Sequence, residues 1–157
     1  MGYDGGYDLM RIMGLDVGDR TIGVAISDSL LITAQGKETI FRVSLKQDID
    51  RLVELINEYE VTKIVAGMPY NMNGSIGPQG EKTQQFMDKL EKKLIYSDRI
   101  KNKIEIEFWD ERMTTLSANR FLIEADVRRE NRKKVVDQLA AILILQGYLD
   151  RNRTVKE

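Results

Sequence analysis

The sequence contains no cysteine and no histidine among its 157 residues. The absence of cysteine excludes disulfides, thiolate metal sites and cysteine nucleophiles. The absence of histidine excludes Ser-His-Asp triads, histidine-ligated zinc and histidine general bases. Hydrolytic chemistry would therefore depend on carboxylates, hydroxyls, lysine, or hard cations such as Mg²⁺ or Mn²⁺ held by carboxylates.

Long apolar runs and excess charge of one sign are also missing. No apolar run approaches the about 20 residues needed to span a bilayer, and the start, MGYDGGYDLM, lacks the features of a secretory signal. The net charge of −1 means that a nucleic-acid binder would need a local basic patch. We expect a cytoplasmic protein with a flexible N-terminal extension (1–9), a single domain (10–150) and a C-terminal tail (151–157).

The stretch RIMGLDVGDRTIGVAISD, residues 11–28, predicts two strands joined by a tight turn at Gly18 and Asp19. It places Asp16 inside an apolar run, as in a central strand that is buried on both faces. A carboxylate there is costly unless its charge is compensated, for which a metal ion is a natural candidate. The alternative is a turn former or a cap for a nearby amide. The second strand alternates large residues (Ile22, Val24, Ile26) with small ones (Gly23, Ala25, Ser27).

The remaining chain alternates strand and helix patterns, which predicts an α/β fold with a mixed central β-sheet flanked by helices. The expected elements are a strand within Leu30–Arg42 that is clearest at Glu38–Arg42, a helix over Leu45–Tyr59, a strand over Lys63–Ala66, a loop over Gly67–Gly80, a helix from Pro78, a strand over Lys103–Trp109, a helix capped by Thr114 and a last helix over about Lys134–Asp150. The last helix is apolar almost all round, so we expect it to be largely buried.

Two further acids stand at positions comparable to that of Asp16. Glu111 follows a predicted strand, and sites in open α/β sheets form at the carboxyl ends of strands; the alternative is a solvated loop acid paired with Arg112. Asp137 shares a helix face with Ala140, Ala141, Ile144 and Tyr148; the alternative is an acid in the first helical turn, favoured by the macrodipole. The three acids could converge on hard cations suited to phosphoryl chemistry.

Four motifs in this order resemble the YqgF/RuvX family over about Arg11 to Tyr148: Asp16-x-Gly18-x-Arg20-x-x-Gly23-Val24-Ala25-x-Ser27-Asp28; Gly67-x-Pro69 with Asn71, Gly74 and Gly77-Pro78-Gln79; Asp110-Glu111-Arg112-x-Thr114-Thr115; and Asp137-x-x-Ala140-Ala141-x-x-x-Leu145-Gln146. The family has the RNase H-like fold. Its members are described as candidate Holliday junction resolvases or, in bacteria, as nucleases that mature the 5′ end of pre-16S ribosomal RNA.

The resemblance implies that residues 10–150 form one RNase H-like nuclease domain, with Asp16, Glu111 and Asp137 as the metal-binding catalytic acids. It implies hydrolysis of a phosphodiester with Mg²⁺ (or Mn²⁺), two ions in all, of which Asp16 would bridge both. It also implies structured RNA or branched DNA as partner, and a pre-ribosomal particle as a further one. A resolvase would favour a homodimer, because its two cuts are related by symmetry.

Basic and polar residues near these acids are candidates for binding nucleic acid. The run Arg128, Arg129, Arg132, Lys133 and Lys134 could neutralise phosphates, although such a run can also be a solvated helix face. The other candidates are Arg20, Asn71, Arg112 and the backbone amides of the loop that ends at Gln79. No row of aromatic residues is arranged for base stacking, so we expect recognition by backbone and shape.

Two other classes remain open. The Asp-x-Gly start also resembles actin-like and sugar-kinase ATPases, which need two such lobes around the nucleotide, whereas this chain supplies one. A non-catalytic module that binds RNA or a DNA junction is the second alternative.

Overall fold

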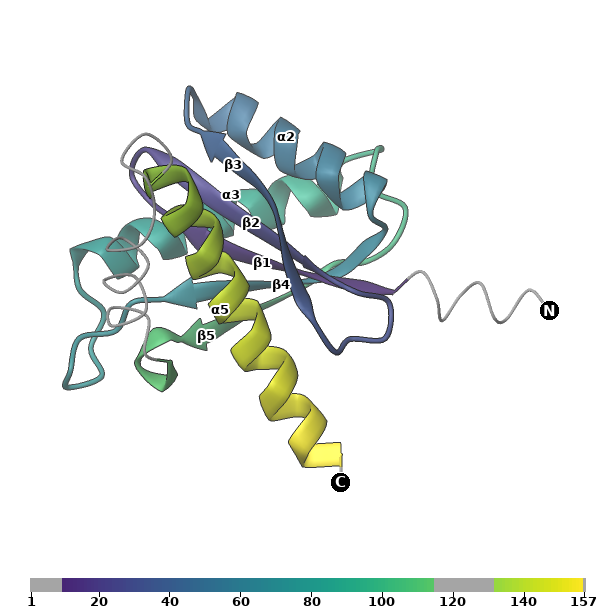
Figure 1. Ribbon diagram of the computed structural model, residues 1–157. Coiled ribbons are helices and arrows are strands. Elements are labelled where there is room, and N and C mark those ends of the chain that lie inside the picture. Colours follow the sequence, from purple (N-terminus) through teal and green to yellow (C-terminus); the bar gives the residue numbers. More distant parts are fainter. Residues whose placement is uncertain (1–9, 115–131, 157) are drawn as a thin grey trace.

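The computed structural model describes residues 10–114 and 132–156, which build a five-stranded sheet with helices on both faces (Figure 1). The strand order is β3-β2-β1-β4-β5. The first three strands are antiparallel neighbours, and β4 and β5 run parallel to β1, so the sheet is mixed as expected. The strands are β1 (Arg11–Val17), β2 (Thr21–Ser27), β3 (Ala34–Phe41), β4 (Val61–Met68) and β5 (Glu105–Asp110).

Helices α2 (Leu45–Glu58) and α3 (Pro78–Tyr96) pack on one face of the sheet, and α5 (Arg132–Lys156) crosses the other face (Figure 1). The sequence determines two of the helix starts. Ser44 caps α2, because its hydroxyl accepts a hydrogen bond from the Gln47 amide at 3.2 Å. Pro78 begins α3, where its missing N–H costs no helical hydrogen bond.

The alternation of large and small residues in β2 separates two hydrophobic cores. Ile22, Val24 and Ile26 lie in the core formed with α2 and α3. Ala25 lies in the core formed with α5. The small face of this strand is therefore used for close packing of α5, as successive side chains of a strand point to opposite faces.

Helix α5 approaches β1 closely because the contact residues are small. A Cβ at Gly14 would stand 2.7 Å from the Leu145 Cβ and 3.1 Å from the Ala141 carbonyl oxygen. Ala140 and Ala141 are both completely buried. The expectation that this alanine pair brings the last helix against the sheet is confirmed.

The last helix differs from its prediction in two ways. It begins at Arg132 rather than Lys134, and it continues to Lys156, through residues expected to form the tail. It buries one stripe and leaves its other sides half-buried, so it is a one-sided helix and not a fully enclosed one. The apolar pattern overestimated how much of the helix is buried, because Ile142 and Leu143 are apolar but only partly buried.

Element ends account for the other differences. Strand β4 is longer than Lys63–Ala66, β3 begins before Glu38, and β5 begins after Lys103. The helix expected after Thr114 lies outside the described residues. No helix within the described part of the chain is long and apolar enough to cross a membrane.

Candidate active site at the carboxyl ends of the central strands

Asp16 lies within the sheet, one residue before the end of β1, and pairs with Gly23 of β2. It is half-buried and has the same parity as Ile12 and Gly14, so its side chain is on the face covered by α5. The turn that follows is closed by the Gly18 N–H, which donates to the Thr21 carbonyl at 2.9 Å. Asp16 is therefore a residue of the sheet rather than of the turn.

A gap in the side chains on this face occurs at Gly67, near the end of β4. Leu15 of β1 pairs with Ala66, which makes Asp16 and Gly67 the next positions on two neighbouring strands. On its other side Gly67 pairs with Trp109 of β5. Adjacent strands lie about 4.8 Å apart, so Asp16 and the end of β5 flank the same glycine.

The side chain of Glu111 occupies the space left by Gly67. Glu111 is the first residue of the short helix η1 (Glu111–Met113), immediately after β5. A Cβ at Gly67 would stand 2.6 Å from Glu111 Oε2 and 2.5 Å from the Ile144 Cδ1. The Glu111 carboxylate therefore lies over β4, on the side of the sheet that carries Asp16.

The course of α5 brings Asp137 to the same end of the sheet. Ala141 lies against Gly14, and Tyr148 further along the helix accepts a hydrogen bond from Lys63, which pairs with Ile12 near the start of β1. The helix therefore runs opposite to β1, and its earlier residues approach the strand's carboxyl end. Asp137 precedes Ala141 by about one turn and Ile144 by about two turns. Because α5 begins at Arg132, Asp137 belongs to the second turn and not, as the alternative required, to the first. Its side chain lies outside the described residues.

The donor set suits a hard divalent cation, because carboxylate oxygens are the ligands that Mg²⁺ and Mn²⁺ prefer. Among the described side chains no group of three acids is close enough to hold a metal, and two acids, Asp16 and Glu111, flank Gly67. The third predicted ligand, Asp137, is on the helix that closes this space. The assignment of all three as metal ligands stays a prediction.

Arg112 holds a loop in place. Its guanidinium donates to Asp110 through Nε at 3.0 Å and through Nη2 at 2.7 Å, and its Nη1 reaches the carbonyl of Met72 at 3.3 Å. It also lies over the Tyr70 ring, 5.4 Å from the centroid. The side-chain hydrogen bond from Arg112 lowers the pKa of Asp110. The ion pair of Arg112 is thus with Asp110, and it links the end of β5 to the loop after β4.

The loop after β4 is a small hairpin, with a bridge between Tyr70 and Ile76. Asn71, predicted to bind nucleic acid, donates from Nδ2 to the Ser75 hydroxyl at 2.9 Å, and its backbone N–H donates to the Ser75 carbonyl. Gly77 follows as the N-cap of α3 and makes no side-chain capping bond. In this conformation Asn71 shapes the loop.

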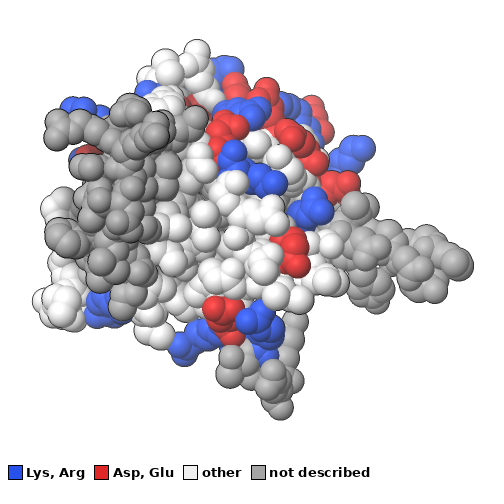
Figure 2. Space-filling view, viewed as in Figure 1, with Lys and Arg blue, Asp and Glu red and all other residues white. Residues whose placement is uncertain are grey.

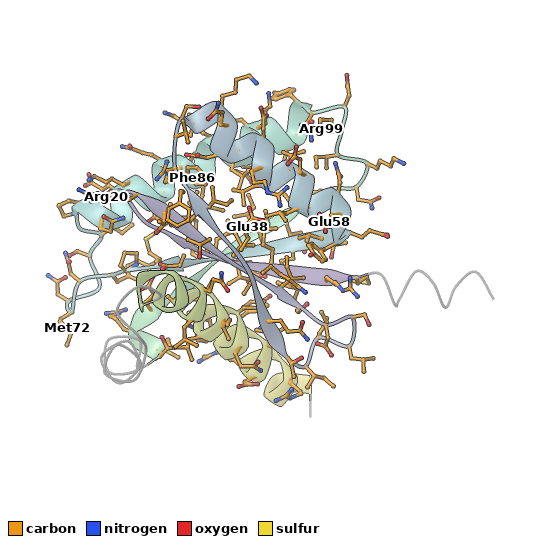
Figure 3. All side chains as sticks on the ribbon, turned by 45° about the horizontal axis from the view of Figure 1, so that its top comes forward. Arg20, Glu38, Glu58, Met72, Phe86 and Arg99 are labelled. Atoms are coloured by element: carbon orange, nitrogen blue, oxygen red, sulfur yellow. The ribbon has the colours of Figure 1, made fainter. Side chains whose placement is uncertain are left out.

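The predicted basic contacts are spread around this end of the molecule. Arg20 is exposed at the β1–β2 hairpin, and Figure 3 shows it on the same side as Met72 of the neighbouring loop. Arg132, Lys133 and Lys134 form the first turn of α5. Arg128 and Arg129 lie outside the described residues. Charged side chains elsewhere gather over α2 and near the C-terminal end of α5, around a central area with few charges (Figure 2).

Sequence reasoning placed Gly67 in a family motif and at the start of a loop but gave it no role of its own, because that role depends on a contact between distant segments. It also missed Arg42, Lys82 and Lys89, which line a groove beside the hairpin. The seven-residue spacing of the two lysines, which puts them on one helix face, was a signal that could have found them.

Comparison with known proteins identifies the chain's relatives. The family model RuvX, described as Holliday junction resolvase, matches residues 10–151. A Clostridioides difficile (strain 630) protein named "Putative pre-16S rRNA nuclease" is 56% identical over 140 residues, covering 89% of this chain and 94% of the relative. A Clostridium tetani protein of the same name is 57% identical over 141 residues, covering 90% and 96%.

Solved structures with a similar fold include RuvC of Thermus thermophilus, with a TM-score of 0.58 and 8% identity, covering 92% of this chain and 96% of that one. The same protein in complex with Holliday junction substrate gives a TM-score of 0.56 at 12% identity, with the same coverage. At these identities the likeness concerns the fold alone, and it confirms the predicted RNase H-like α/β architecture.

Proposed function

Because the chain belongs to the RuvX family, we propose that it is a metal-dependent nuclease that hydrolyses phosphodiester bonds in nucleic acid. The observation that supports this most directly is the arrangement around Gly67. Asp16 on β1 and Glu111, directly after β5, lie on either side of this glycine, and α5, which carries Asp137, covers it. A chain without histidine or cysteine has few other ways to build a hydrolytic site.

We propose that Asp16, Glu111 and Asp137 would together hold Mg²⁺ or Mn²⁺, two ions in all. Two such ions, when bound, would supply an activated water and charge stabilisation for the leaving 3′ oxygen. The chain's own contribution is placement. The sheet fixes Asp16, and Gly67 leaves the space in which the Glu111 carboxylate lies.

The substrate we favour is the precursor of 16S ribosomal RNA, cut near its 5′ end in the cytoplasm and within a pre-ribosomal particle. The names of relatives that share more than half of their residues with this chain support this choice. The second candidate is a four-way DNA junction, which the description of the family model favours. Both substrates present phosphodiesters to the same acids, so the choice depends on binding and not on the chemistry.

A cleavage assay tests the proposal. Purified protein is incubated with pre-16S 5′-leader RNA, a four-way DNA junction and single strands, in Mg²⁺, Mn²⁺ or EDTA. We expect cutting of the leader with either cation and none in EDTA. Asp16→Asn and Glu111→Gln should each abolish cutting, because each removes a charged ligand while keeping the size of the side chain.

Asp88→Asn is the matched control, since it makes the same chemical change at an exposed position of α3. It should cut like the wild type. Normal cutting by both Asp16→Asn and Glu111→Gln would show that the site is elsewhere. Preference for the junction, together with a dimeric mass in its presence, would replace the RNA proposal with the resolvase one.

A further inference from the structure

A groove lies between the β1–β2 hairpin and α3, on the sheet face opposite to α5. Its volume is about 210 Å³, and apolar side chains of the α2–α3 core, Val17 and Phe86, contribute to its lining. The cations on it are Arg42, Lys82 and Lys89, and the amides are Gln79 and Gln85. We refer to these three cations and the hollow between them as the hairpin groove.

The charge of the hairpin groove is positive. Its lining includes one acid, Asp19, which is 3.3 Å from Lys82, and the two side chains are 60% and 61% exposed. An exposed pair of this kind contributes little to stability, so an incoming phosphate can replace Asp19 at small cost. Lys82 and Lys89 project from the same face of α3, two turns apart.

Arg42 is held rigidly before any ligand arrives. Its Nε donates to Asp48 at 3.1 Å, and its Nη1 donates to the Gly18 carbonyl at 2.8 Å. The guanidinium lies 4.9 Å from the centroid of the Phe86 ring. Because Asp48 is only 3% exposed, its buried carboxylate restricts the movement of the Arg42 guanidinium. A guanidinium with fixed orientation loses little conformational freedom on binding a phosphate.

The hairpin groove adjoins the candidate active site through the backbone. Val17, in its lining, directly follows Asp16, and successive residues of a strand face opposite sides of the sheet. The end of the β1–β2 hairpin therefore separates the acids on the α5 side from the cations on the α3 side. A single strand bound at Asp16 would not reach the cations on the other side of the hairpin. A substrate with two strands could place one strand at Asp16 and the other at these cations.

We propose that the hairpin groove binds the phosphate backbone of a second strand, so that the enzyme's substrates are duplex or branched nucleic acids rather than single strands. This inference rests on the proposed nuclease function and names the substrate class for it. It assigns Lys82 and Lys89 as phosphate contacts outside the catalytic site, with Arg42 as the rigid contact between hairpin and helix.

Binding without cleavage tests the inference. Affinities for a hairpin RNA, a four-way DNA junction and a single strand of equal length are measured in EDTA over a range of salt concentrations. For Lys82→Gln/Lys89→Gln we expect weaker binding of the hairpin and the junction. The slope of log K against log salt should fall by about 2, one for each lost contact. Binding of the single strand should stay unchanged.

Lys101→Gln/Lys103→Gln is the matched control. It removes the same charge from exposed lysines near the start of β5, at the other end of that strand from Glu111, and should bind like the wild type. Circular dichroism checks that both variants are folded. An unchanged salt slope for Lys82→Gln/Lys89→Gln, or an equal loss on the single strand, would overturn the inference.

Two further outcomes are informative. Inorganic phosphate at constant ionic strength should compete poorly, and strong competition that vanishes in Lys82→Gln/Lys89→Gln would make the groove a small-anion site and overturn the inference. Since no divalent cation is present, failure of cleavage and failure of the groove are separable. A chain that binds duplex through these lysines but never cuts would refute the nuclease proposal alone.

Discussion

The carboxylate of Glu111 lies directly over Gly67, so that a Cβ added to the glycine would stand 2.6 Å from Oε2. The same Cβ would stand 2.5 Å from the Ile144 Cδ1. Both neighbours are terminal atoms of side chains, so a change of side-chain conformation can relieve the contact without a shift of the backbone. Residue 67 therefore controls where the Glu111 carboxylate lies more than whether the protein folds.

Gly67→Ala should reduce cleavage about 100-fold, because a displacement of about 1 Å at a catalytic group can have an effect of this size. The free energy of unfolding should fall by about 1–2 kcal/mol through overpacking. Gly36→Ala is the control: its Cβ would meet Gln138 Oε1 at 3.0 Å, also on α5. It should alter stability and leave the cleavage rate alone. Equal rates for both variants would contradict the role of Gly67.

Trp109 offers a direct measure of metal binding. It is the only tryptophan in the sequence and precedes Glu111 by two residues. Its side chain is 8% exposed. Its Nε1 is buried and has no hydrogen-bond partner among residues 10–114 and 132–156. Its ring lies edge-on to Tyr148, with 6.5 Å between the ring centroids. Titration with paramagnetic Mn²⁺ should quench its fluorescence with a saturable curve. In Glu111→Gln the curve should shift to higher Mn²⁺ concentration, and an identical curve would remove Glu111 from the metal site.

A network distant from the candidate acids should control acid stability. Lys63 Nζ is 2.7 Å from Glu107 Oε2, and the Tyr148 hydroxyl donates to the same oxygen at 2.7 Å. The hydrogen bond from Lys63, and then that from Tyr148, lowers the pKa of Glu107 below its ordinary value of 4.5. The contribution of ionised Glu107 to the stability of the folded protein is therefore complete above about pH 4.5. It is lost as the pH falls through the lowered pKa of Glu107 in the folded state.

Tyr148→Phe should lower the free energy of unfolding by about 1 kcal/mol at pH 7, the value of a hydroxyl hydrogen bond. In Glu107→Gln the loss of stability on acidification should be shallower than in the wild type. Urea unfolding between pH 3 and 7 measures both. A wild-type pH profile in Glu107→Gln would mean that the network does not contribute. Cleavage of nucleic acid should be unaffected in either variant.

The Asp110–Arg112 pair should act through the loop after β4. Arg112→Lys and Asp110→Asn each break the two-point contact, so both should make residues 69–77 more susceptible to limited proteolysis. If loop support is the role of Arg112, both variants should lower cleavage to a similar extent, with an unchanged salt slope of binding. A reduced slope in Arg112→Lys alone would show that Arg112 contacts a phosphate, as its place in the family motif suggested.

The spacing of apolar residues, together with the residues that begin or end elements, was enough to predict most of the helices and strands. The alternation in β2, the helical pattern of α2 and Pro78 at the start of α3 each act locally, and each produced the expected element. The Ser44 cap of α2 is a local signal that the prediction did not use. The ends of the last helix were not predictable, because its apolar pattern does not distinguish residues packed on a sheet from those left half-covered. The family was recognisable because four short motifs kept their order over nearly the whole chain.

The sequence by itself determined which chemistry is available. Without histidine or cysteine, hydrolytic chemistry is left to carboxylates, hydroxyls, lysine or bound hard cations, and the family motifs point to three carboxylates. Only the tertiary structure decided how they are arranged, because the pairing of β4 with β1 and with β5 is set by contacts between residues far apart in the chain. Gly67 carries no chemistry of its own. The absence of a side chain at this position matters only in the folded protein, where it leaves space for the Glu111 carboxylate and for α5 beside Asp16.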